Sequence, residues 1–323
     1  MRIDFPVFAT LIEADEADDG SFSGQWCRDL PGERDCILPF HASPAPAPDP
    51  AARFGPFETA VSSVSGEWRF EFERRGLGRG AFEQLPSGEV NGTIEIPSEL
   101  GDLRFLAGVA GKDSVFLSTF DGQHALLLEG RLEGDGKMSG ELLVGGGDSD
   151  PFIARRGESV SLPDPLEQVK AKEGRALPVL RDPRFQGKAV IVEIFGTWCP
   201  NCNDLAPVLA KIHREHRERG LEVLGLAYEA IDDSDYVERR IREYKSKHGI
   251  DWEIALAGTV EDLAEGEPSW LSGVTGVPIL VFVGRDGEVR ATYVGFSGPA
   301  TGEAHLRAVA DLEKLAADIL GEP

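Results

Sequence analysis

The sequence predicts an all-β first half followed by an α/β second half. In the first half, large apolar residues alternate with charged ones, as in residues 68–73 (WRFEFE), which is typical of a strand with one buried face. After Gly157, continuous apolar runs alternate with segments of helical periodicity. The chain has 323 residues, about twice the length of a ~150-residue domain. We therefore expect two domains, residues 1–157 and 158–323.

The first half contains several short runs with strand character, separated by turns that hold Gly, Asp or Ser. Because these runs recur at regular spacing, we expect an antiparallel meander curled into a barrel or a sandwich. The proline-rich residues 43–56 predict an extended connector. It separates the meander from a short N-terminal piece, which we expect to form an added hairpin. The runs are 68–73, 89–96, 103–109, 114–120, 124–132 and 138–144.

The second half predicts the order βαβ, an insertion, then ββα. Its apolar runs are short enough for buried strands, and its amphipathic segments are long enough for helices. The predicted strands are 189–195, 221–228, 279–283 and 288–294, and the predicted helices are 200–219, 235–248, 258–271 and 301–320.

The charge of the chain argues against two classes of partner. Fifty-six acidic side chains against 33 basic ones leave a formal charge of −23, which repels nucleic-acid backbones and anionic lipid surfaces. No run approaches the ~20 apolar residues of a membrane-spanning helix. The N-terminus also lacks the apolar core of a signal peptide. We expect a soluble chain that binds no nucleic acid and inserts into no membrane.

Two cysteines, Cys199 and Cys202, stand at the end of a predicted buried strand and in the first turn of the following helix. A Cys-x-x-Cys pair beside a βαβ unit is a redox signature, because helical spacing brings the two sulfurs within disulfide reach. The helix N-terminus favours the thiolate form of Cys199. Structural zinc would require a second ligand pair at a suitable spacing, so we expect no metal and no cofactor.

The motif Phe195–Cys202 (FGTWCPNC), followed by Gly276-Val277-Pro278, resembles the thioredoxin superfamily, in particular the TlpA/ResA-type thiol-disulfide oxidoreductases. The resemblance covers roughly residues 160–320. It implies a central sheet flanked by helices and a cis Pro278 packed against the active-site disulfide. The substrate-binding residues that it implies are Trp198, Pro200, Asn201, Val277, Pro278 and Phe296.

The resemblance also places a buried acid beneath the disulfide, at Glu193. An apolar strand raises the pKa of such a carboxyl by desolvation and suits it to accept a proton. We expect the more accessible Cys199 to attack a disulfide of a partner protein and the buried Cys202 to release it, with Glu193 managing the proton. An unidentified electron donor would complete the cycle. Leu205 replaces a second glutamate found in many relatives.

Two alternatives remain open at this point. The β-domain could be the functional half, a barrel that binds a ligand or a protein, with the second half as an accessory module; an open apolar cavity would favour this hypothesis. A peroxiredoxin-like peroxidase would share the fold, but Val192 and Gly196 occupy the two positions where that family's motif carries Pro and Ser or Thr. This departure disfavours peroxidase activity.

The remaining cysteines, Cys27 and Cys36, flank a Pro31-Gly32 turn that can reverse the chain. We expect a structural disulfide between them, which would persist in an oxidising compartment. The alternative is two free thiols in a cytosolic protein. With the disulfide, we expect an extracytoplasmic bacterial protein, periplasmic or secreted, whose export signal is not part of the given sequence.

Overall fold

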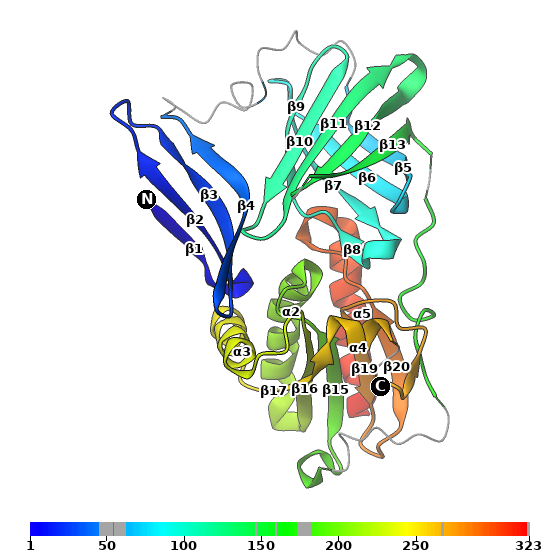
Figure 1. Cartoon of the computed structure of the whole chain (residues 1–323). Helices are drawn as coiled ribbons and strands as arrows, with labels where there is room; N and C mark the ends of the chain where they lie inside the picture. Colours follow the sequence, from blue (N-terminus) through cyan, green and yellow to red (C-terminus); the bar gives the residue numbers. More distant parts are fainter. Residues whose placement is uncertain are drawn as a thin grey trace. The chain divides into compact units, whose positions relative to one another are not determined.

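The computed structural model describes residues 1–44, 54, 63–145, 147–158, 160–172, 182–265 and 268–321. The chain divides into two compact units (Figure 1). The first comprises Met1–Ser98 and Asp102–Ser161, and the second comprises Glu99–Gly101 and Leu162–Pro323. Most of the proline-rich segment 43–56 lies outside the described residues. None of the helices that the structure describes has the length and apolar character needed to cross a membrane.

The chain begins with a four-stranded antiparallel sheet, not the added hairpin that we predicted. Its strands pair in chain order, and β3 and β4 place Cys27 directly opposite Cys36. A disulfide joins these two residues, with an S–S distance of 2.05 Å. The prediction missed the first two strands because β1 is short and both strands mix acidic with apolar residues. The strands are β1 (Arg2–Phe5), β2 (Thr10–Glu16), β3 (Phe22–Leu30) and β4 (Glu33–Ala42).

The rest of the first unit is an eight-stranded antiparallel barrel, formed by β5–β7 and β9–β13. Sequential neighbours pair from β9 to β13, and the ring closes where β13 pairs with β5 and β6 pairs with β7. The bounds are β5 (Gly66–Phe72), β6 (Gly76–Gln84), β7 (Glu89–Ile96), β9 (Leu106–Ala110), β10 (Ser114–Phe120), β11 (Ala125–Glu133), β12 (Lys137–Val144) and β13 (Asp148–Arg156); the short β8 (Gly101–Asp102) pairs beside β7.

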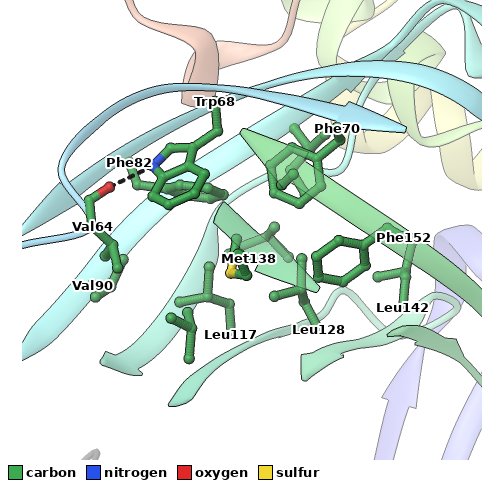
Figure 2. Packing of buried hydrophobic residues seen from close by; sticks show 14 of the residues in the cluster. Val64, Trp68, Phe70, Phe82, Val90, Leu117, Leu128, Met138, Leu142 and Phe152 are labelled. Atoms are coloured by element: carbon green, nitrogen blue, oxygen red, sulfur yellow. Dashed lines mark hydrogen bonds between the residues drawn. The ribbon is translucent and has the colours of Figure 1, made fainter. Parts of the chain in front are cut away.

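Large side chains fill the interior of the barrel (Figure 2). Alternate residues of β5 point inward, so that Trp68, Phe70 and Phe72 are all buried. The ring of Phe152 packs against Phe70 with the centroids 5.1 Å apart. The indole N–H of Trp68 donates to the backbone oxygen of Val64 at 2.8 Å, which satisfies its one polar atom. The barrel interior is therefore a packed hydrophobic core.

Two barrel strands escaped the sequence prediction, and their composition explains why. In β6, glycines occupy two of the inward positions, Gly78 and Gly80, so the apolar alternation is weak. A side chain at Gly80 would collide with the ring of Phe70, 2.5 Å from its ideal Cβ. Strand β13 begins with polar residues and contains Pro151, which lowers its strand propensity. Both segments therefore form strands because of their packing within the barrel and not because of their local sequence.

The second unit is built on a five-stranded mixed sheet in the order β17-β16-β15-β19-β20. The first three strands run parallel, and β19 and β20 are antiparallel to their neighbours. Every residue of the central β15 is buried, as its continuous apolar run predicts. The strands are β15 (Ala189–Phe195), β16 (Leu221–Glu229), β17 (Glu253–Thr259), β19 (Ile279–Val283) and β20 (Val289–Val294); β14 (Lys170–Ala171) pairs separately with β18 (Leu271–Ser272).

Helices α2 (Pro200–His216), α3 (Ser234–His248) and α5 (Glu303–Leu320) accompany this sheet, and α5 packs against β15 and β19. This arrangement is the thioredoxin fold. The predicted helix 258–271 is much shorter in the structure, where α4 spans only Val260–Ala264, and the preceding strand β17 was not predicted. Strand β17 is partly exposed at the edge of the sheet, so its sequence lacks the apolar continuity of the inner strands.

Candidate active site

The cysteine pair lies where the central strand β15 passes into helix α2. Cys199 is the N-cap of α2, and its Sγ accepts a hydrogen bond from the Cys202 N–H at 3.1 Å. Pro200 occupies the first helical position, where a backbone N–H would have no intrahelical acceptor, so its absence costs no hydrogen bond. A disulfide joins the two cysteines, whose Cα atoms are 5.3 Å apart. The helix N-terminus thus directs a backbone donor at the sulfur of Cys199, which favours its thiolate after reduction.

The two sulfurs differ less in exposure than the sequence predicts. Cys202 is fully buried, but Cys199, the expected accessible nucleophile, is also only 3% exposed. Cys199 therefore offers little more surface to a protein disulfide than Cys202 does.

The second loop of the site carries Pro278, immediately before β19. The Val277–Pro278 peptide bond is cis. The carbonyl oxygen of Val277 lies 3.8 Å from the Cys199 Sγ. A third loop is held to the second, because the Gly295 N–H donates to the carbonyl of Pro278 at 2.8 Å. Phe296 follows and is buried, so the structure brings the predicted residues Val277, Pro278 and Phe296 to one place.

Glu193 lies on β15 and is completely buried. Neither of its carboxylate oxygens has a hydrogen-bond partner among the described residues. Desolvation raises the pKa of this carboxyl to about 8. Tyr244 on α3 is equally buried and donates its hydroxyl to the carbonyl of Cys202 at 3.0 Å. Burial raises the pKa of Tyr244, and the negative charge of Glu193 adds to that effect.

A second buried glutamate, Glu229, holds the loop that precedes the cysteines. Its carboxylate accepts two hydrogen bonds from Thr197, one from the backbone N–H at 2.9 Å and one from the hydroxyl at 2.8 Å. Burial raises its pKa, opposed by these bonds and by the nearby guanidinium of Arg240. Glu229 was not among the site residues predicted from the sequence. Its position as the last residue of a buried apolar strand was the signal that could have identified it.

Other contacts hold the same loop in place. The indole N–H of Trp198 donates to the carbonyl of Tyr228 at 2.9 Å. The side-chain amide of Asn203 donates to the carbonyls of Thr197 and Cys199 at 3.1 and 2.9 Å. The sequence analysis did not single out Asn203, because an asparagine inside a helix carries no distinctive pattern. Together these bonds fix the backbone on both sides of the reactive cysteine.

No family model matches the chain, but known thiol-disulfide oxidoreductases are similar to part of it. The chain is 21% identical over 125 residues to the thiol-disulfide oxidoreductase ResA of Bacillus thuringiensis (strain Al Hakam), covering 39% of this chain and 65% of ResA. It is 28% identical over 150 residues to the thiol:disulfide interchange protein CycY of Rhizobium leguminosarum bv. viciae, covering 46% of this chain and 63% of CycY.

Among solved structures, a thiol:disulfide interchange protein of the thioredoxin family from Chlorobium tepidum TLS is similar to this chain. The two are 21% identical with a TM-score of 0.34, and the match covers 50% of this chain and 100% of that one. The chain spans between about half and two thirds of the length of the curated relatives that it matches.

Proposed function

We propose that this chain, whose second unit has the thioredoxin fold and resembles ResA and CycY, is a thiol-disulfide oxidoreductase that acts on disulfides of partner proteins. One observation carries the proposal: Cys199 caps helix α2, accepts the Cys202 N–H, and lies 3.8 Å from the carbonyl oxygen of Val277. This places a sulfur that is activated as a thiolate beside the backbone before a cis-proline.

The proposed reaction begins with the reduced dithiol. The Cys199 thiolate attacks one sulfur of the substrate disulfide, which forms a mixed disulfide and releases the other substrate sulfur as a thiolate. The Cys202 thiol then gives its proton to the Glu193 carboxylate and attacks the Cys199 sulfur. This step forms the Cys199–Cys202 disulfide and frees the second substrate sulfur. Two electrons have passed from the protein to the substrate, and an electron-donor protein restores the dithiol.

Glu193 is suited to this proton transfer because burial raises the pKa of its carboxyl to about 8. That value is close to the roughly 8.5 of an ordinary thiol. A proton can therefore move between the two groups with little free-energy change in either direction. An ordinary exposed carboxylate would be a much weaker base.

We also propose that the protein works outside the cytoplasm. The disulfide between Cys27 and Cys36 supports this assignment, because bonds of this kind persist in oxidising compartments. The alternative in which the barrel stores a ligand in its interior has less support, since Trp68, Phe70 and Phe152 fill that space. The filled interior therefore supports a structural role for the barrel and not ligand storage.

Trapping the mixed disulfide tests the proposed function. Cys202→Ser leaves Cys199 able to attack but removes the resolving thiol, so incubation with oxidised insulin should accumulate a covalent complex that dithiothreitol releases. Cys199→Ser is the matched control and should form no complex. Equal trapping by both variants, or trapping by neither, would refute the assignment. Equilibration of the wild-type pair with glutathione then gives its reduction potential.

A further inference from the structure

A three-residue segment, Glu99–Gly101, belongs to the second unit although it follows strand β7 of the barrel in the chain. It lies against the loops that surround the redox pair. The Leu100 carbonyl accepts the Phe296 N–H at 2.9 Å. The Glu99 carbonyl accepts from the side-chain amide of Asn201, two residues after Cys199, at 3.2 Å. Two backbone carbonyls of the segment thus accept hydrogen bonds from Phe296 and Asn201, which the sequence analysis assigned to substrate binding.

The fit around this segment is close. A Cβ added to Gly101 would lie 2.1 Å from the Asn201 amide nitrogen, and one added to Gly295 would lie 2.7 Å from the Leu100 oxygen. A Cβ on Gly276 would lie 3.2 Å from the Leu100 Cδ1, which places the leucine side chain beside the Val277–Pro278 loop. A side chain at Gly295 would collide with the backbone of the segment, whereas one at Gly101 or Gly276 would displace the end of the Asn201 or Leu100 side chain.

Leu100 adopts this position at a conformational cost. Its φ of +54° is in the left-handed region, which leucine rarely enters. A residue keeps such a conformation only where its surroundings impose it. Leu100 is also buried, with 8% of its surface exposed. The contacts with Phe296 and the Gly276 loop therefore offset the strain of the leucine backbone.

We propose that Glu99–Gly101 occupies the groove in which a substrate places the residues next to its disulfide, and that it must leave before Cys199 reacts with a protein. This inference rests on the proposed function. It accounts for a nucleophile that is almost as buried as its resolving partner. The segment also indicates the substrate class, a peptide that carries an aliphatic residue followed by a small one. The aliphatic residue would take the place of Leu100, and its backbone oxygen would accept the Phe296 N–H.

The rate at which Cys199 is alkylated tests this proposal. In a Cys202→Ser background, with the Cys27–Cys36 disulfide intact, Cys199 is the single free thiol. Leu100→Ala removes the side chain that contacts the Gly276 loop, and Gly101→Ala displaces the Asn201 amide that donates to the Glu99 carbonyl. Both should increase the rate of reaction with iodoacetamide about tenfold or more, where tenfold corresponds to about 1.4 kcal/mol of docking free energy. Leu85→Ala, at an exposed leucine, is the matched control and should not change the rate.

Hydrogen exchange gives a second readout that does not depend on chemistry at the sulfur. The Phe296 amide should lose protection in Leu100→Ala and Gly101→Ala, and segment 99–101 should become more mobile in a mixed disulfide trapped with insulin. Circular dichroism identifies any variant that fails to fold, and the other variant then decides the question. If both folded variants keep the alkylation rate and the Phe296 protection of the Cys202→Ser parent, the proposal that Glu99–Gly101 occupies the substrate groove is wrong. If Cys202→Ser with an unchanged 99–101 segment also forms no mixed disulfide with insulin, the oxidoreductase function is wrong independently.

Discussion

Replacing Glu193 by glutamine should change how stability depends on pH. Burial raises the pKa of this carboxyl from 4.5 to about 8, so between these values the folded protein keeps a proton that the unfolded chain has released. Stability therefore falls as pH rises through this range, by about 1.4 kcal/mol per pH unit. The accumulated loss is roughly 3 kcal/mol at pH 7 and about 5 kcal/mol above pH 8. Glutamine does not titrate, so the variant lacks this loss.

Urea unfolding of the oxidised protein between about pH 5 and pH 9, combined with hydrogen exchange of the β15 amides, measures the effect in the second unit. The variant should gain stability relative to wild type by about 1.4 kcal/mol per pH unit up to about pH 8, and the difference should then level off. Glu222→Gln, on the adjacent strand β16 and partly exposed, is the matched control. A stability difference that does not change with pH would refute the argument that Glu193 is protonated by burial.

Three further perturbations test other parts of the structure. Glu229→Ala removes the acceptor of both Thr197 hydrogen bonds and should cost about 1–3 kcal/mol for each buried donor left unpaired; urea unfolding measures the loss, and Glu229→Gln, which keeps an acceptor, should lose less. Replacing Cys27 and Cys36 together by serine should destabilise the first unit by roughly 2.5–3 kcal/mol in calorimetry, since the bond closes a loop of about ten residues; an unchanged transition would contradict its structural role. Phe152→Ala should cost about 3–5 kcal/mol through the cavity left in the barrel, and a loss below 1 kcal/mol would contradict the packed interior.

The sequence predicted the second unit in more detail than the first. Strand β15 and the start of helix α2 have strong local signals, a continuous apolar run and a proline at the first helical position. These two elements alone place Cys199 and Cys202 correctly. The edge strand β17 was missed because its burial is partial, so its sequence lacks the continuous apolar run of the inner strands.

The missed parts of the site depend on contacts between residues far apart in the chain. Glu229 was not predicted as a site residue, and only the structure shows that its carboxylate is buried and bound to Thr197. The segment Glu99–Gly101 lies almost 200 residues before Phe296, and nothing in its composition indicates that the two share a hydrogen bond. Local patterns suggest candidate site residues, but they do not show which distant residues contact them.

The way the barrel closes has a consequence for the order of folding. Strand β5 pairs with β13, so the closing ladder joins Trp68 to Arg156, from opposite ends of the barrel segment. The chain must lose the entropy of closing this long loop before the contacts of the ladder can stabilise it, and this slows folding. The N-terminal sheet, by contrast, pairs only neighbouring strands, and its disulfide closes a short turn. As the chain folds from its N-terminus, this sheet can form early, whereas the barrel stays open until β13 is available to pair with β5.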